Sequence, residues 1–443
     1  MTAVLIVLST VCGTLMASVL ACVPSLHIYN VMGLLVMLGH VLIARGIELP
    51  SEVVIPFAGA LMVGYSMLNT LPSVLLAAPD ESAMFTVLPG QKFLMQGRGY
   101  EAVIMTTIGG MIGLMALLFI VAPLAPHVLP VTQKVFRGHT HWILWTVIAF
   151  MLMSEWPKGG RLGRSGWTKF LDSWKTTGAG LLTFALSGLL GFVLIFRTPI
   201  AVDVAFQNLM PAFVGLFAVP WLVLNIATNV TVPKQKLEIE TQLRMDDMLR
   251  GGFAGTLGGG FAAYFPVVTG GVGGLLAGHA TALRNDRVFL ISQGASKLVY
   301  YVGGLLLFFV PGVHVKRGGG AALLRSLITP HTDFEYYLML TAMALAGVIS
   351  LVMVGPLTRG MLWLIGKVGY RRISTLALLL IVGLVVGITG LTGLAVMVVG
   401  TGIGLMPVLY GSRRMNCLGV IMLPMACNMS GVGTTVAGWL GLL

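Results

Sequence analysis

The sequence predicts an all-α, polytopic membrane protein. Of its 443 residues, 57% are apolar and only 9% are charged, whereas soluble domains carry about 25% charged residues. Apolar runs recur along the whole chain, and a helix that spans a membrane needs about 20 mostly apolar residues. The chain therefore has room for roughly 10 to 13 membrane segments, some of them short, and we expect a multi-pass protein of the cell (inner) membrane.

The charged residues predict how these segments are divided. The net charge of +12 arises largely in short loops between apolar runs, which is typical of loops that stay in the cytoplasm and argues against a nucleic-acid partner. The longest mixed-charge segment, 229–250, is predicted to be a cytoplasmic linker between a first membrane half, 1–228, and a second membrane half, 251–443.

A short motif occurs once in each half. Gly13-Thr14-Leu15 is followed by Pro24, and Gly255-Thr256-Leu257 is followed by Pro266, eleven residues after the glycine in both cases. A proline inside an apolar run kinks or breaks a helix, and broken helices at matching positions of two halves indicate a transporter site near the midplane. We predict two structural repeats with proline-broken, re-entrant hairpins, and the sequence leaves open whether they are inverted.

The first break is unusually polar for a membrane segment. Pro24 is followed within six residues by Ser25, His27 and Asn30, and we take all four residues as candidates for substrate binding. The alternative is structural: Ser25 and Asn30 cap the interrupted helix, and His27 bonds to nearby backbone.

A long proline-rich stretch follows the next apolar run. It contains two adjacent acids, Asp80 and Glu81. Because carboxylates are costly inside a membrane, these two residues mark either a polar site or the first turn of a helix that begins near Ser82. The prolines of this stretch exclude one plain spanning helix. The candidate binding residues here are Asn69, Pro79, Asp80, Glu81, Ser82 and Arg98.

The second break offers backbone rather than side chains. After Pro266 come Thr269, Gly270 and Gly271, where exposed N–H groups favour an anion, although such glycines also let membrane helices pack closely. Lys297 lies in an apolar stretch, where it binds an anion, pairs with an acid or extends to the interface.

Enzyme signatures are absent from the sequence. It contains no HExxH, GxSxG or GxxxxGK[ST] motif, and its four cysteines lack the spacing of a zinc site. We therefore expect no catalytic residue, metal ligand or cofactor, apart from a coupling H⁺ or Na⁺.

Three segments resemble the large membrane subunit of the tripartite tricarboxylate transporters, most closely its stand-alone archaeal-type branch. The most specific one runs from Ala78-Pro79-Asp80-Glu81-Ser82 through Leu88-Pro89-Gly90 to Gln96-Gly97-Arg98-Gly99-Tyr100-Glu101. The others are Val23-Pro24-Ser25-Leu26-His27 with Asn30, and Gly402-Ile403-Gly404-Leu405-Met406-Pro407 with Arg413-Arg414. Ser25 and Val267 stand where the family pattern usually has glycine.

The resemblance implies secondary transport of a small carboxylate. Bacterial members work with a small membrane subunit and a periplasmic binding protein, whereas archaeal-type relatives are not tied to either partner. We expect an ion-coupled transporter of an anionic solute, in contact with membrane lipid, and the sequence leaves a homo-oligomer open.

Two alternatives remain at this point. One is a flippase that recycles polyprenyl-phosphate carrier lipid, because a broken-helix anion site opening to the bilayer would serve a lipid phosphate equally well. The other, from a different class, is a membrane enzyme or assembly subunit acting on a lipid-linked sugar, with Asp80 and Glu81 as acid and base.

Overall fold

The computed structural model describes residues 2–24, 26–155, 166–200, 208–228, 230–239, 244–281, 285–313, 315 and 318–443. Their contacts divide them into two compact units. Unit 1 contains the described parts of 2–134 and 222–379, and unit 2 those of 135–221 and 380–443. Both units draw on both halves of the sequence, so the predicted division at the linker stays a prediction.

Every element of the described residues is a helix and none is a strand, which confirms the all-α class. The elements are α1 (Thr2–Leu20), α2 (Ile28–Ala44), α3 (Ser51–Leu68), α4 (Thr70–Leu75), η1 (Met84–Thr86), α5 (Val87–Met95), α6 (Gly99–Ala116), η2 (Leu117–Val121), α7 (Ala122–Phe136), α8 (Thr140–Met153), α9 (Gly166–Phe192), η3 (Val193–Arg197), α10 (Met210–Phe213), η4 (Val214–Ala218), α11 (Val219–Thr228), α12 (Met245–Tyr264), α13 (Gly270–Ala280), α14 (Asp286–Leu298), η5 (Val299–Gly303), α15 (Gly304–Phe309), α16 (Gly319–Leu324), α17 (Asp333–Val368), α18 (Tyr370–Tyr410), η6 (Arg414–Leu418), α19 (Gly419–Met429) and α20 (Gly433–Trp439).

The membrane class is confirmed by the length and hydropathy of the helices. Within the described residues, seven helices are long and apolar enough to cross a membrane, or eight if Arg414–Met429 and Gly433–Trp439, bent by 117°, form one span. The apolar helices α2 and α8 are shorter. The prediction of 10 to 13 segments included short segments of this kind, so helix length alone does not test that number.

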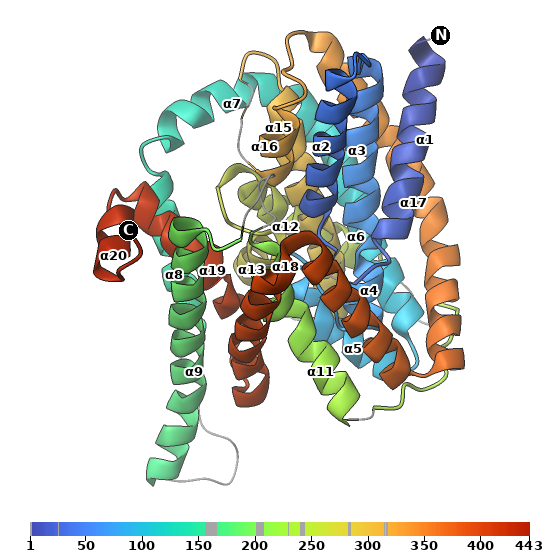
Figure 1. Ribbon diagram of the computed structural model, residues 1–443. Coiled ribbons are helices and arrows are strands. Elements are labelled where there is room, and N and C mark those ends of the chain that lie inside the picture. Colours follow the sequence, from blue (N-terminus) through green and yellow to red (C-terminus); the bar gives the residue numbers. More distant parts are fainter. Residues whose placement is uncertain are drawn as a thin grey trace. The chain divides into compact units, whose positions relative to one another are not determined.

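Unit 1 contains two similar groups of three helices. In one group α1, α3 and α17 pack against one another, with α1 in blue and α17 in orange in Figure 1, and in the other group α12, α14 and α6 do so. The glycine of each Gly-Thr-Leu motif lies at the corresponding contact. A Cβ on Gly13 would meet the carbonyl oxygen of Phe57 on α3, and one on Gly255 that of Ser292 on α14. This correspondence supports the predicted repeat.

Both predicted breaks fall between helices. Pro24 lies in the gap between the end of α1 at Leu20 and the start of α2, and Pro266 lies between the end of α12 at Tyr264 and the start of α13. Val267 has φ +57°, a conformation that a β-branched residue rarely adopts because its Cβ approaches the next carbonyl. That the hairpins re-enter the membrane stays a prediction, and nothing in the helix bounds tests whether the repeats are inverted.

Unit 2 is built around α9 and α19, which pack against each other. Within this unit the half-buried Arg414 donates from Nη2 to the carbonyl oxygens of Leu216 (3.2 Å) and Phe217 (2.5 Å). Pro220 has no N–H to bond the Leu216 carbonyl, so the guanidinium satisfies it instead. Residues 156–165, which follow α8 in the sequence, lie outside the described residues.

Candidate functional site

The centre of the candidate site is Asp80, in the loop that follows α4. Tyr65, Asn69 and Tyr301 each donate a hydrogen bond to Oδ2, at 3.3, 2.5 and 3.0 Å. The backbone N–H groups of Ser82 and Ala83 and the Ser82 hydroxyl reach Oδ1 at 3.1, 2.8 and 2.9 Å. Asp80 thus caps the turn before η1, as the structural alternative predicts, and also ties that turn to α3 and η5.

Lys297 is joined to Asp80 through one amide. The side chain of Lys297 is 1% exposed, and its ammonium donates to Asn69 Oδ1 and, at 2.5 Å, to the Thr70 hydroxyl. The Asn69 Nδ2 group then donates to Asp80. A buried ammonium must be compensated, and this relay from lysine to amide to carboxylate compensates it while fixing the end of α3.

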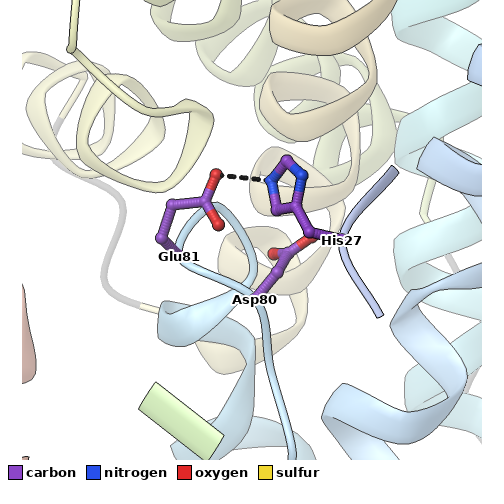
Figure 2. Close-up of side chains that lie close together, drawn as sticks. All are labelled: His27, Asp80 and Glu81. Atoms are coloured by element: carbon purple, nitrogen blue, oxygen red, sulfur yellow. Dashed lines mark hydrogen bonds and ion pairs between the residues drawn. The ribbon is translucent and has the colours of Figure 1, made fainter. Parts of the chain in front are cut away.

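Glu81 points the other way and meets His27 from the first break. His27 Nε2 lies 2.9 Å from Glu81 Oε1, as the dashed line in Figure 2 shows. The other imidazole nitrogen, Nδ1, accepts the N–H of Tyr29 at 3.1 Å at the start of α2. Because Nδ1 accepts, Nε2 carries the hydrogen and donates to Glu81. Glu81 Oε2 is buried and has no hydrogen-bond partner within the described residues.

The His27, Asp80 and Glu81 ligand atoms lie within 4.8 Å of one another, which raises the question of a metal ion. Both oxygens of Asp80 already accept three hydrogen bonds each, and both nitrogens of His27 are engaged. Glu81 Oε2 is then the one ligand atom of this group that remains free, whereas a metal site needs four or more ligands.

Three tyrosines that the sequence analysis did not select surround the imidazole of His27. The ring centroids of Tyr29, Tyr65 and Tyr301 lie 4.7, 6.4 and 5.8 Å from that of His27. The sequence contains a signal that could have identified two of them. Tyr65 lies four residues before Asn69, and Tyr301 lies four residues after Lys297. Polar pairs at this spacing share one face of a helix.

The second break contacts the same loop. A Cβ on Gly271 would lie 2.8 Å from the Ser82 carbonyl oxygen, and one on Gly270 would lie 3.0 Å from Lys297 Cα. Thr269, which precedes α13, is buried, and its hydroxyl has no partner within the described residues. The loop around Asp80 therefore lies between the two breaks, with His27 on one side and the start of α13 on the other.

Comparison with known proteins identifies the family. The model described as the Tripartite tricarboxylate transporter TctA family matches residues 6–419. The chain belongs to this family. An uncharacterized protein of Methanocaldococcus jannaschii is 22% identical over 370 residues, which cover 83% of each chain, in agreement with the stand-alone branch. No solved structure matches the chain.

For this TctA-family chain, the match and the apolar helices together establish a multi-pass membrane component of a transporter. The matched region includes both breaks and the Asp80 loop. It also includes the third segment that carries the resemblance, from Gly402 to Arg414.

The remaining predicted residues lie in different surroundings. Arg98 of the TctA-family chain is not part of the Asp80 network, because it forms an ion pair of 2.7 Å with Glu101 at the start of α6. Asn30 is buried, and its N–H donates to the His27 carbonyl at 3.0 Å. Pro24 and Pro79 are buried next to the polar residues, and Pro266 is half-buried. Ser25 lies outside the described residues.

Proposed function

We propose that this chain is an ion-coupled secondary transporter of an anionic, carboxylate-type solute in the cell (inner) membrane, and that the coupling ion is a proton bound by Glu81 beside His27. The observation that carries the proposal is the free, buried Oε2 of Glu81 in a loop that contacts both broken hairpins. Neither alternative from the sequence has a comparable observation in its favour.

The anion is proposed to bind at the start of α13. The first N–H groups of a helix have no intrahelical acceptor and carry partial positive charge, and the free hydroxyl of Thr269 lies at the same place. Lys297 contributes the positive charge of its ammonium from the side, while its hydrogen bonds to Asn69 and Thr70 hold the loop. These groups suit a carboxylate oxygen, which accepts hydrogen bonds only.

Coupling follows from electrostatics. An ionised Glu81 repels an anion at the neighbouring helix terminus, and protonation removes the repulsion. Two ligands that favour each other in this way bind cooperatively, typically with a coupling of about 1–3 kcal/mol. The solute and the proton are therefore expected to load together.

Partner subunits belong to this proposal as well. The family is that of tripartite transporters, so a small membrane subunit and a periplasmic binding protein are the candidate partners. The resemblance to the stand-alone branch favours a chain that transports without them.

The experiment is uptake by the purified chain in proteoliposomes. Labelled tricarboxylate, dicarboxylate and phosphate-ester solutes are tested under an imposed pH gradient and, separately, under a Na⁺ gradient. We expect accumulation of a carboxylate that is driven by the pH gradient and abolished by a protonophore. Absence of uptake and of binding for every solute under both gradients would rule out the transport proposal, and accumulation under the Na⁺ gradient alone would rule out the proton.

A further inference from the structure

A basic groove lies in unit 1, and the residues that line it are far from Asp80 in the sequence. Its walls are the extended segment 230–237, the last turns of α17 and the first turn of α18. Its volume is about 790 Å³, which is within the usual range of ligand sites, about 300–1,000 Å³.

The wall formed by the extended segment is fixed by hydrogen bonds. Gln235 accepts the N–H of Gly99 at 2.8 Å and donates to the Leu94 carbonyl at 2.8 Å. The N–H of Lys236 donates to the Gly97 carbonyl at 2.8 Å. Because the three bonded residues lie at the end of α5, in the α5–α6 connection and at the start of α6, this wall of the groove is held in place by the fold.

The charge of the groove is positive and uncompensated. Lys234, Arg359, Arg371 and Arg372 line it, and none of its lining residues is acidic. No ion pair of the described residues involves these four side chains. Four cations around one groove attract a phosphate or carboxylate group.

Both α17 and α18, which supply three arginines to the groove, are candidate spans and also carry exposed apolar side chains near it in the sequence. Trp363 lines the groove and is 63% exposed, with Lys367 4.8 Å from its ring centroid. Leu376 and Leu379, one turn apart on α18, are 59% and 63% exposed. Exposed tryptophan beside Lys and Arg is typical of the headgroup level of a membrane, and the two leucines follow Arg371 and Arg372 along α18.

We infer that this groove binds the phosphate headgroup of an anionic phospholipid, whose acyl chains lie on Leu376 and Leu379. Clusters of basic residues at the cytoplasmic end of membrane helices bind anionic headgroups. A soluble anion would account for the arginines but not for the adjoining Trp363 and exposed leucines. None of the residues that line the groove belongs to the Asp80 loop, and the lipid site does not depend on the proposed transport function.

The test is native mass spectrometry of the full chain in mixed micelles that contain phosphatidylglycerol or phosphatidylcholine. The test variant is R371Q/R372Q, and the matched control is R45Q/R325Q, which removes two exposed arginines outside the groove. Each basic residue near the surface contributes about fivefold to anionic-lipid affinity. We therefore expect phosphatidylglycerol binding to fall about 25-fold in R371Q/R372Q and to be retained in R45Q/R325Q.

Further arms distinguish the lipid from a free anion, and the first of them use the wild-type chain. The wild-type chain should retain phosphatidylglycerol over phosphatidylcholine, lose it with rising salt, and keep it in the presence of glycerol phosphate. Trp363→Ala should weaken it. Equal binding of the two lipids, equal loss in both double variants, or displacement by millimolar glycerol phosphate would overturn the inference.

Discussion

The imidazole Nε2 of His27 lies 2.9 Å from Glu81 Oε1, although the two residues are 54 positions apart in the sequence. Through this contact, polar groups connect the helix break at Pro24 to the loop that contains Asp80 and Glu81. That loop carries the most family-specific motif of the sequence. The neighbouring carboxylate, Asp80, is instead saturated by hydrogen bonds from the protein. Two adjacent acids therefore have different roles: Asp80 holds the loop together, and Glu81 retains a free oxygen.

Asn69→Ala tests the relay between Lys297 and Asp80. The substitution removes the amide that accepts from the ammonium and donates to the carboxylate, and leaves both charges buried with fewer partners. Hydrogen bonds to charged groups contribute about 1.5–3 kcal/mol each, so we expect the free energy of unfolding in detergent to fall by about 2–3 kcal/mol.

Asn225→Ala is the matched control. The Asn225 amide is also buried but bonds to neutral groups, the Leu76 carbonyl and the Tyr370 hydroxyl, so a loss of about 1 kcal/mol is expected. A loss for Asn69→Ala no larger than that for Asn225→Ala would show that the relay does not stabilise the fold.

Thr269→Val tests the proposed anion position. The change keeps the shape of the side chain and removes a hydroxyl that bonds to nothing in the described residues, so stability should be unchanged or slightly higher. If the hydroxyl donates to a bound carboxylate, solute affinity measured by calorimetry should fall about tenfold or more. Thr256→Val removes another unpartnered buried hydroxyl, on α12, and should leave the affinity as it is. Equal affinities in the two variants would remove Thr269 from the site.

Gly255→Ala tests the close contact of α12 with α14. An added Cβ would lie 2.6 Å from the Ala295 Cβ and would also meet the Ser292 carbonyl oxygen, which forces the helices apart at a cost of about 1–3 kcal/mol. At Gly260, on the same helix, a Cβ meets nothing within 4 Å, so Gly260→Ala should stabilise by up to about 1 kcal/mol. Thermal unfolding in detergent compares them, and an unchanged transition for Gly255→Ala would argue against the contact.

The fold was predictable from the sequence to the level of helix type and helix breaks. Low charge and long apolar runs indicate membrane helices, and Pro24 and Pro266 do fall between helices. The two compact units were not predictable, because they depend on which helices pack together and not on the pattern along the chain.

The candidate site was predictable in part. His27, Asn69, Asp80, Glu81, Ser82 and Lys297 do come together, because polar residues within apolar runs must find partners. The sequence does not reveal that Lys297 bonds to Asn69, 228 positions away, rather than to a solute. It also does not separate Asp80 from Glu81, since their roles depend on which way each side chain points.

The central claim is that Glu81 carries the coupling proton, and Glu81→Gln tests it most directly. Solute accumulation in proteoliposomes is followed with and without a pH gradient for wild type, Glu81→Gln and Glu48→Gln, the last removing an exposed carboxylate. We predict that Glu81→Gln still exchanges solute across the membrane but no longer accumulates it in response to the gradient, whereas Glu48→Gln behaves as wild type. Accumulation by Glu81→Gln that follows the pH gradient as in wild type would contradict the account.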